Sequence, residues 1–354
     1  MLFLTLAILV AGLLILASAS MVMSQKNFGN IYFYTLRQFL YGGILGGIAL
    51  ALTQWMPYRI WKRLALPLMI LSFLLSALLF IPHFSYVAGG ARRWLQAGGF
   101  SFQPSEVLKF SFLVYLASWL DARRKEIKSV SYGMIPFSLM LAIIGIFLVM
   151  QPDIGTLGVV VATAGIMYFL GGGKVSQIGM LIVLGLVMLY LVVQIAPYRL
   201  QRILVFLDPQ TDPKGIGYQI NQAFIGIGSG GFWGLGFGKS LQKYSYLPEP
   251  MGDSIFAIFA EETGLVGVCL LLGLFATFFW RGIFIARRAP DVFGKLLGAG
   301  ISVGIMAQVF INMAAISGLL PLTGIPLPMV SYGGTSLVIT LASIGVLLNI
   351  SKYT

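Results

Sequence analysis

The chain has 354 residues, of which 58% are hydrophobic and only 10% are charged, and its mean hydropathy is +0.92. Soluble globular domains carry roughly 25% charged residues, so this composition excludes an ordinary soluble protein and predicts a polytopic membrane protein. The net charge of +12 would suggest a nucleic-acid partner in a soluble protein. In a membrane protein it reflects basic residues kept on the inner side and beside anionic lipid headgroups, so we expect contact with membrane lipids and no nucleic acid.

Two scarce side chains limit the chemistry further. The single cysteine, Cys269, lies in an apolar run, so the chain has no intramolecular disulfide framework and no cysteine metal site. The single histidine, His83, excludes a histidine-cluster metal site and any charge relay that needs a second histidine. The first apolar run begins at Met1 without a basic segment before it, and it is interpreted as a retained span.

Ten apolar segments approach the roughly 20 residues that a membrane-spanning helix needs. We expect spans, in chain order, at about 2–23, 39–55, 64–81, 106–120, 134–150, 154–170, 175–196, 255–279, 296–320 and 329–350. They predict an all-α polytopic membrane protein with about ten transmembrane helices, folded as a single membrane domain over 1–354. A large loop at about 197–254 joins the seventh and eighth spans.

The distribution of Lys and Arg predicts the orientation of the chain. Basic runs at 122–128 and 281–288 are typical of inner anchors, which places the N-terminus inside and the large loop outside. The stretch 198–262 is also the longest interval that is not simply a span, and it holds six of the eleven acidic residues. We therefore expect the chemistry to be concentrated there.

Ionisable residues at membrane depth are costly and so mark functional candidates. Arg92 and Arg93 form a cationic pair beside Trp94 that suits a phosphate, because guanidinium makes bidentate contacts with oxyanions; headgroup anchoring explains the same pair equally well. Glu106 and Lys109 are three residues apart at the start of the fourth span and share a helix face. They form either a self-satisfied ion pair or a pair that lines an outward-facing aqueous cavity.

Two other polar stretches have structural interpretations. Asp153, in QPDIGT at 151–156, is interpreted as an acid in the first turn of the sixth span, where the helix dipole favours it. The glycine-rich run at 226–238 lacks the preceding strand of a dinucleotide site, and Trp233 stands where a phosphate loop would need glycine. We expect a compact re-entrant or surface segment in which the backbone approaches a neighbour closely, with N–H groups possible for a phosphate.

Asp253 lies at the mouth of the eighth span, after two prolines. From its position alone, an N-cap, which Asp fills well, and a catalytic carboxylate are equally good interpretations. Glu261 and Glu262 follow on the same helix. Because successive side chains cannot both face one cavity, we expect at least one of them to pair with a neighbouring element or to be protonated.

These motifs together resemble the SEDS family of peptidoglycan polymerases, which includes FtsW, RodA and SpoVE and has ten spans. The matching stretches cover almost the whole chain in family order: ARRW at 91–94, QPSEVLKF at 103–110, QPDIGT at 151–156, FLDPQTDPKGIGYQINQ at 206–222, IGSGGFWGLGFGKSLQKYSYLPEP at 227–250, DSIFAIFAEETGLVG at 253–267 and PLTGIPLPMVSYGGTSL at 321–337. The segment LQKYSYLPEP resembles the FtsW branch of the family more closely than the RodA branch. Met251 and Gly252 depart from the His-Thr that commonly precedes the catalytic Asp, and Ser254 replaces a usual Phe.

The resemblance implies a glycosyltransferase that polymerises lipid II, an undecaprenyl-pyrophosphate-linked disaccharide-peptide. The reaction takes place on the outer face of the bacterial cytoplasmic membrane, for cell division or elongation. An α-linked donor and a β-linked product imply one inversion, hence one base and no covalent nucleophile. The remaining requirement is charge stabilisation at the pyrophosphate.

The resemblance also implies the roles of particular residues. Asp253 is the expected catalytic base, or the group that orients the acceptor and a divalent cation (Mg or Mn) that it partly holds; no organic cofactor is expected. The expected substrate-binding residues are Arg92, Arg93, Glu106, Lys109, Glu249 and Ser331. We expect these groups to form an outer cavity between the fourth span and the head of the eighth. The expected partner is a class B penicillin-binding protein, whose transpeptidase crosslinks the nascent strand.

Two other functions stay open at this stage. A lipid II flippase would use polar residues along a path through the bundle, for which Gln308, Asn312 and Glu261 or Glu262 are available. Against it, the polar residues gather on one side of the membrane, whereas alternating access predicts a site at the midplane and related repeats. A non-catalytic division scaffold would tolerate the loss of Asp253.

Overall fold

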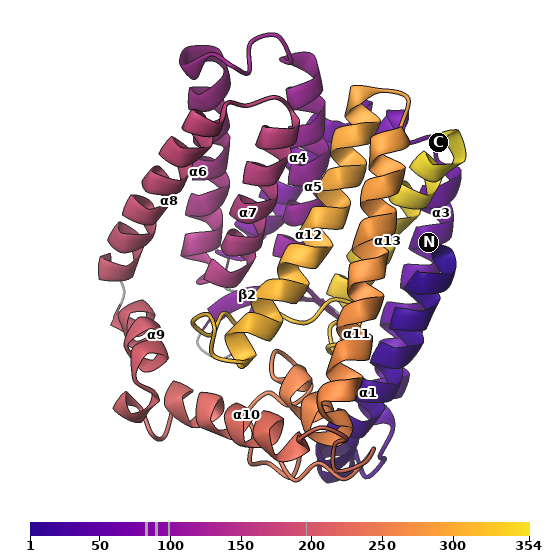
Figure 1. Ribbon diagram of the computed structural model, residues 1–354, viewed down its shortest axis with the longest axis vertical. Helices are drawn as coiled ribbons and strands as arrows, with labels where there is room; N and C mark the ends of the chain where they lie inside the picture. Colours follow the sequence, from indigo (N-terminus) through magenta and orange to yellow (C-terminus); the bar gives the residue numbers. More distant parts are fainter. Residues whose placement is uncertain (82–83, 89–90, 98–99, 196) are drawn as a thin grey trace. The chain divides into compact units, whose positions relative to one another are not determined.

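The computed structural model describes residues 1–81, 84–88, 91–97, 100–195 and 197–354; His83 lies outside them. The described chain is almost entirely helical (Figure 1). Its helices are α1 (Leu2–Phe28), α2 (Phe33–Arg37), η1 (Gln38–Ile44), α3 (Leu45–Trp55), α4 (Arg59–Leu78), α5 (Pro104–Ala122), η2 (Val130–Met134), α6 (Ile135–Met150), α7 (Ile154–Leu170), α8 (Val175–Ile195), α9 (Pro197–Leu207), η3 (Pro209–Thr211), α10 (Ile216–Gly230), α11 (Ile255–Arg288), α12 (Val292–Ile316), α13 (Gly334–Ile350) and η4 (Ser351–Tyr353).

The helices confirm the all-α membrane class. Among the described residues, eight helical segments are long and apolar enough to cross a membrane: Leu2–Phe28, Phe33–Trp55, Arg59–Leu78, Val130–Met150, Val175–Gln194, Ile255–Arg288, Val292–Ile316 and Gly334–Tyr353. The other two predicted spans coincide with α7, which is apolar but shorter, and with α5, which has 19 residues and includes Glu106, Lys109 and Asp121. The second segment begins at Phe33, before its predicted start, because α2 and η1 continue directly into α3.

A small antiparallel sheet between α4 and α5 was not predicted. Its strands β1 (Ser85–Ala88), β2 (Ala91–Ala97) and β3 (Phe100–Phe102) pair in the order β1-β2-β3. Ser85 and Phe102 both lie opposite Leu95, on its two sides. The seven-residue β2, ARRWLQA, does not alternate apolar and polar residues, and β1 and β3 have only four and three residues, so the strand pattern is absent or too short to recognise.

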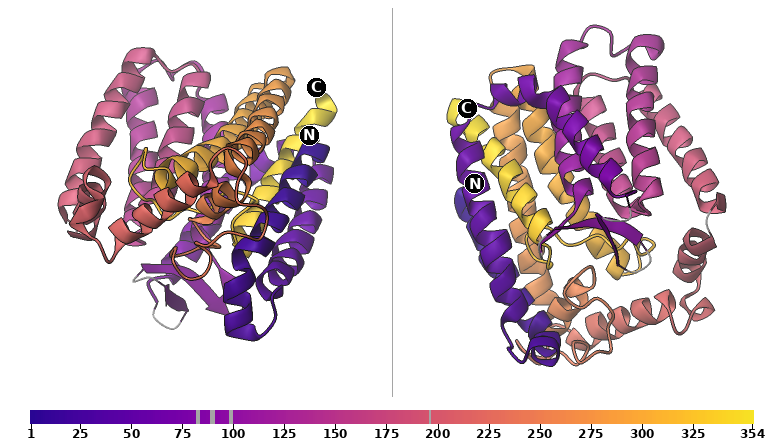
Figure 2. Two further views of the ribbon diagram at one scale, coloured as in Figure 1. Left: turned by 60° about the horizontal axis from the view of Figure 1, so that its bottom comes forward. Right: turned by 180° about the vertical axis from the view of Figure 1, so that it is seen from behind.

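The described chain forms two compact units. Unit 1 comprises Met1–Leu45, Val193–Phe278 and Gln308–Leu337, and unit 2 comprises Gly46–Val192, Phe279–Ala307 and Val338–Thr354. In unit 2, α4 packs on α5, and α7 packs on both α5 and α6 (Figure 2). Aromatic pairs lie between these helices: Trp61 meets Phe110 edge-on with ring centroids 5.2 Å apart, and Phe137 lies 4.5 Å from Tyr168.

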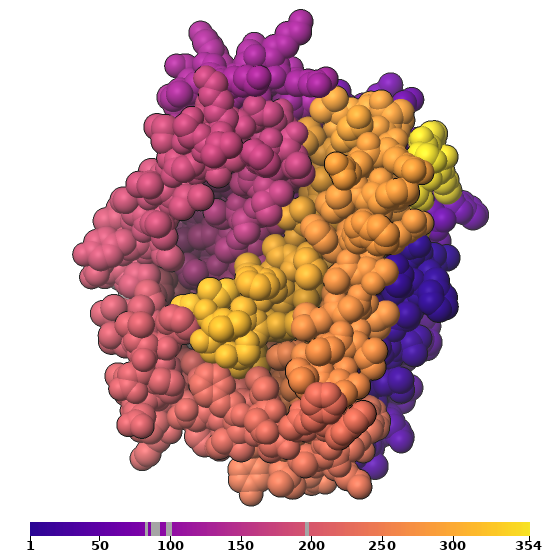
Figure 3. Space-filling model, in the orientation of Figure 1, coloured from indigo at the N-terminus to yellow at the C-terminus, as the bar shows by residue number. Residues whose placement is uncertain are grey.

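The decisive feature of unit 1 is a break in α11 at Gly264, whose φ of 63° and ψ of −165° are not helical. The glycine-rich segment after α10 supplies the backbone hydrogen bonds that the break removes, and the segment lies at the surface (Figure 3). Four bonds join the two: Leu235 N to Glu261 O (3.0 Å), Gly236 N to Glu262 O (3.0 Å), Leu265 N to Gly231 O (3.0 Å) and Val266 N to Phe232 O (3.2 Å). A backbone interrupted near lipid requires such substitutes, because unpaired N–H and C=O groups are costly there.

The glycines make this contact possible, as the sequence predicted. A Cβ at Gly230 would lie 2.1 Å from the carbonyl oxygen of Ala260, and one at Gly234 would lie 2.2 Å from that of Glu262. Gly234 also has a φ of 78°, which side chains disfavour. The close approach is therefore backbone against backbone, and it places the loop directly on the helix that follows Asp253.

Candidate functional site

Asp253 lies in the turn before α11, which begins two residues later at Ile255. Its carboxylate Oδ1 accepts a long hydrogen bond, 3.5 Å, from Nε2 of Gln219 on α10, and the same amide donates to Ser254 Oγ at 2.9 Å. Among the described contacts, the carboxylate accepts no bond from the first N–H groups of α11. The N-cap interpretation of Asp253 is therefore not supported, and the carboxylate keeps most of its acceptor capacity.

The surroundings of Asp253 shift its titration toward neutrality. Burial, and then repulsion from the Glu249 carboxylate, raise the pKa of Asp253 from 3.8 to about 6, against smaller lowering effects of its own backbone N–H, Arg202 and Gln219. Arg202, on α9, is held by a 2.9 Å bond from its Nη1 to the carbonyl of Leu322. A carboxylate with such a pKa suits a general base, because catalytic pKa values near the working pH are the most effective.

Glu249 and Ser331, two predicted substrate-binding residues, both contact Gly252, the residue before Asp253, in the same unit. Glu249 is exposed, and its carbonyl accepts from Gly252 N at 3.0 Å. Ser331 is only 4% exposed; its hydroxyl donates to the carbonyl of Gly252 at 2.7 Å and accepts from Leu327 N at 2.8 Å. The donor of Ser331 is thus used within the protein, whereas the carboxylate of Glu249 is accessible.

The predicted cationic group belongs to unit 2. Glu106 and Lys109 form an ion pair of 3.0 Å on α5, and Glu106 is 2% exposed. The guanidinium of Arg93, on β2, donates to the carbonyls of Gln151 and Pro152. The backbone of Arg92 lies in β2, but its side chain is outside the described part. The ion pair between Glu106 and Lys109 agrees with one of its two predicted interpretations. The side chain of Arg93 is bound to the connection between α6 and α7.

The same connection confirms the interpretation of Asp153. Asp153 is the N-cap of α7; its Oδ1 accepts from Thr156 N at 3.3 Å, and its Oδ2 accepts from Ser105 Oγ at 3.1 Å. The neighbouring Gln151 is 1% exposed, and neither polar atom of its side-chain amide has a hydrogen-bond partner among the described residues. Such an amide beside Arg93 is a further candidate for substrate contact that the sequence did not single out.

Glu261 and Glu262 both have protein partners, which confirms the expected pairing. Glu262 forms a 3.0 Å ion pair with Lys243 and accepts from Ser18 Oγ at 2.6 Å. Glu261 accepts from the backbone N–H groups of Leu241 (3.0 Å) and Gln242 (3.3 Å) and from the hydroxyl of Ser240. The two carboxylates therefore bind the loop to the broken helix.

The polar residues of α12 that favoured a flippase are also used inside unit 1. Gln308 donates to the carbonyl of Pro326 at 3.0 Å. Asn312 donates to the carbonyls of Asp253 (2.9 Å) and Ile325 (2.8 Å). Their described bonds hold non-helical backbone in place, so they give no support to a polar transport path.

A divalent cation finds only part of a coordination shell in this chain. Among the described residues, no group of three or more His, Cys, Asp or Glu side chains is placed to hold a metal ion. Carboxylate oxygen is a ligand that Mg²⁺ prefers, and Mg²⁺ commonly takes one or two carboxylates and completes its shell with water and substrate phosphate. The weakly bound carboxylate of Asp253 is the donor that this site offers to such a cation.

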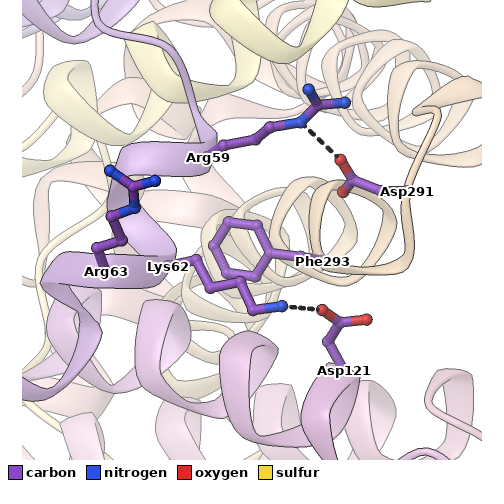
Figure 4. Close-up of a pocket in the computed structure, with 6 residues that line it drawn as sticks. All are labelled: Arg59, Lys62, Arg63, Asp121, Asp291 and Phe293. Carbon is purple, nitrogen blue, oxygen red and sulfur yellow. Dashed lines mark hydrogen bonds and ion pairs between the residues drawn. The ribbon is translucent and has the colours of Figure 1, made fainter.

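A cavity in unit 2 is chemically different from the Asp253 site (Figure 4). It has a volume of about 440 Å³ and is lined by Arg59, Lys62, Arg63, Asp121, Asp291 and Phe293. Arg59 pairs with Asp291 at 3.2 Å, and Lys62 pairs with Asp121 at 2.6 Å. Both carboxylates are thus paired with cations, and the cavity contains none of the predicted site residues.

The fold and the site define a class: a polytopic helical membrane protein with one carboxylate of raised pKa beside a broken span. The chain belongs to the FtsW/RodA/SpoVE family, whose sequence profile, described as "Cell cycle protein", matches residues 1–354. It is 41% identical over 349 residues to stage V sporulation protein E of Bacillus subtilis (strain 168), covering 99% of this chain and 95% of that protein. It is also 41% identical over 344 residues to a probable peptidoglycan glycosyltransferase FtsW of Geobacter sp. (strain M18), covering 96% and 92%.

Solved structures give the same assignment. A chain from work on "Structural coordination of polymerization and crosslinking by a peptidoglycan synthase complex" matches with a TM-score of 0.81 and 30% identity, covering 99% of this chain and 96% of that one. The rod shape determining protein RodA of Thermus thermophilus matches with a TM-score of 0.73 and 28% identity, covering 99% and 95%.

The sequence did not predict that Arg202 and Gln219 lie near Asp253, or that Asn312 binds its carbonyl. Arg202 and Gln219 lie in the loop that the sequence identified as functional, on the helices α9 and α10, but nothing in their spacing aims them at Asp253. Asn312 was noticed as a polar residue within a span, which is the signal that could have identified it. Its partner is a backbone carbonyl, which no side-chain pattern reveals.

Proposed function

We propose that this chain is a peptidoglycan glycosyltransferase that polymerises lipid II on the outer face of the cytoplasmic membrane, for cell division or elongation. The observation that carries the proposal is Asp253, a weakly bound carboxylate whose pKa is raised to about 6. Membership of a family that includes named peptidoglycan glycosyltransferases supplies the substrate class.

In the proposed reaction Asp253 acts as the general base. Its carboxylate takes the proton of the acceptor's 4-hydroxyl while that oxygen attacks the anomeric carbon of the donor. The bond from the anomeric carbon to the pyrophosphate oxygen breaks, and undecaprenyl pyrophosphate leaves with the bonding electron pair. One displacement inverts the α linkage to β, so a single base suffices and no covalent intermediate forms.

The other proposed residues bind the substrate. Arg92, Arg93 and Lys109 suit the pyrophosphate, because cations stabilise the charge that develops on a leaving phosphate, and Glu106 orients Lys109 through their 3.0 Å pair. Glu249, which is exposed, is the proposed substrate contact near Asp253, whereas the hydroxyl of Ser331 is used within the protein. Asp253 would partly hold a divalent cation, which would supply further neutralisation of the pyrophosphate when bound.

Asp253→Asn tests the function directly. We expect it to slow lipid II polymerisation by roughly 10²- to 10⁴-fold, the usual contribution of a general base, as measured by glycan-strand length and rate on gels. Asp208→Asn is the matched control, because Asp208 is exposed and, within the described part of the chain, its carboxylate accepts a single bond, from Gln210 N at 3.0 Å. Wild-type polymer from Asp253→Asn would overturn the assignment.

The stability of Asp253→Asn separates lost chemistry from lost folding. Because the pKa of Asp253 is raised in the fold, the native state binds the proton more tightly, and stability falls as pH rises from about 3.8 to about 6. At 1.36 kcal/mol per pKa unit this cost is at most about 3 kcal/mol at neutral pH. Asparagine removes this cost, so Asp253→Asn should be at least as stable against unfolding as the wild type.

The pH dependence provides an independent prediction. We expect the initial rate of polymerisation to fall about tenfold per pH unit below about 6, because only the unprotonated carboxylate accepts a proton. Glu249→Gln removes the repulsion that raises the pKa of Asp253 and should move the inflection to lower pH. A rate that stays constant down to pH 5, or an inflection that ignores Glu249→Gln, would contradict the role of Asp253.

The two other functions give different outcomes in parallel assays. A flippase would still translocate labelled lipid II in liposomes after Asp253→Asn, and a scaffold bearing this change would still complement growth. We propose a class B penicillin-binding protein as the partner, in line with the synthase complex that one structural relative comes from. Polymerisation with and without the cognate transpeptidase tests whether the partner is needed for activity.

A further inference from the structure

Three consecutive carbonyl groups, ending at Asp253, each accept a hydrogen bond from a different group of the C-terminal part of unit 1. Tyr332 N donates to the carbonyl of Met251 at 2.9 Å. Ser331 Oγ donates to Gly252 at 2.7 Å, and Asn312 Nδ2 donates to Asp253 at 2.9 Å. The turn that carries the carboxylate is therefore fixed residue by residue, although the carboxylate itself is only weakly bound.

The group that holds this turn is itself rigidly held. Asn312 is 1% exposed, and its amide also donates to the carbonyl of Ile325 at 2.8 Å. The main chain of 331–333 is bound to Gln38 on η1, which accepts from Gly333 N at 3.1 Å and donates to the carbonyl of Ser331 at 3.4 Å. Buried bonds thus run from η1 through the connection between α12 and α13 to the turn at Asp253.

The same connection borders the carboxylate. A Cβ at Gly324, whose φ is 72°, would lie 3.9 Å from Oδ2 of Asp253. The backbone that Asn312 ties to Asp253 therefore also forms part of the surroundings of the reacting oxygen atoms. A shift of the turn against this connection would change both the direction of the carboxylate and the space in front of it.

We propose that Asn312 is a positioning residue for glycosyl transfer: its amide fixes the main chain of Asp253 so that the carboxylate meets the acceptor hydroxyl. Ser331 assists by fixing the preceding carbonyl. This inference rests on the proposed function of Asp253. Misplacement of a catalytic group by about 1 Å costs rate without requiring any loss of substrate affinity.

The chain offers a close structural control for Asn312. Gln308 lies one helical turn earlier on α12, is 6% exposed, and donates its amide to the carbonyl of Pro326 at 3.0 Å. It thus holds the same connection by the same kind of bond, and that bond goes to Pro326 rather than to the turn at 251–253. Removing either side chain loosens the connection, and only the removal of Asn312 releases Asp253.

The test compares Asn312→Ala, Gln308→Ala, Ser331→Ala and Asp253→Asn in lipid II polymerisation, with rates normalised to folded protein. We expect Asn312→Ala to lower kcat at least tenfold with KM within threefold of wild type. Ser331→Ala should also lower kcat, but by less. This second variant tests the positioning role if Asn312→Ala does not fold. Gln308→Ala should keep kcat within twofold.

Three results would overturn the positioning role: equal losses of kcat in Asn312→Ala and Gln308→Ala, a loss confined to KM, or wild-type kinetics in Asn312→Ala (in Ser331→Ala, where Asn312→Ala does not fold). The Asp253→Asn arm shows which proposal has failed. If Asp253→Asn is inactive while Asn312→Ala is fully active, only the positioning role fails. If Asp253→Asn itself is active, the proposed base fails and the positioning role fails with it.

Discussion

Replacing Lys243 with Met is expected to lower the free energy of unfolding by about 3–5 kcal/mol, the usual cost of leaving one charge of a buried pair without its partner. The side chains of Lys243 and Glu262 are 0% and 3% exposed, and their charged atoms are 3.0 Å apart. Lys243 also donates to the carbonyl of Gly238 at 2.6 Å and to Ser18 Oγ at 3.2 Å. Without it, the buried Glu262 carboxylate loses its charged partner.

Two further variants make this prediction specific. The double variant Lys243→Met with Glu262→Leu removes both charges and should recover most of the lost stability, because apolar replacements of a buried pair are often neutral. Lys62→Met breaks the Lys62–Asp121 pair, which is shorter at 2.6 Å but 45% and 21% exposed, and should cost about 0–1 kcal/mol. Denaturant unfolding in detergent measures all three; equal costs for the two single variants would show that burial of the Lys243 pair is energetically unimportant.

This buried pair illustrates what the sequence predicts and what it does not. Two successive glutamates on one apolar helix predict that one of them needs a partner, and the structure confirms it. The partner itself was not predictable, because Lys243 lies in a loop and Ser18 lies on α1, 244 residues away along the chain from Glu262. Only the break at Gly264 and the loop bound to it bring these groups together.

Eight of the ten predicted spans coincide with described helices that are long and apolar enough to cross a membrane, and these were predictable because apolar length is a local property that the bilayer imposes. The small sheet and the start of α11 depend on partners elsewhere in the chain, and they were missed or left open. The same holds at the site. Asp253 was identified from its motif, but the choice between cap and catalyst depends on where the helix begins, two residues further on. Asn312 was noticed as polar, and its role depends on a carbonyl 59 residues away.

Gly264→Ala is expected to destabilise unit 1 strongly. With a φ of 63° and a ψ of −165°, Gly264 has a conformation that is essentially restricted to glycine and costs other residues about 1–3 kcal/mol. A Cβ there would also lie 2.4 Å from Gly234 N and 2.6 Å from the carbonyl oxygen of Phe232. These atoms are backbone, so neither can move without disturbing the bonds that join the loop to α11.

The control lies on the same helix. A Cβ at Gly273 would meet no neighbouring group of the described chain within 4 Å, so Gly273→Ala should be neutral or stabilise the helix by up to about 1 kcal/mol. Thermal unfolding in detergent compares the two alanine variants, and equal midpoints would contradict the account of the break. If Gly264→Ala displaces the loop, Glu261 and Glu262 lose their backbone and Lys243 partners together. We then expect polymerisation to fall with stability, because these contacts hold the end of the helical segment 255–263 that lies next to the break, and Asp253 precedes the other end of that segment.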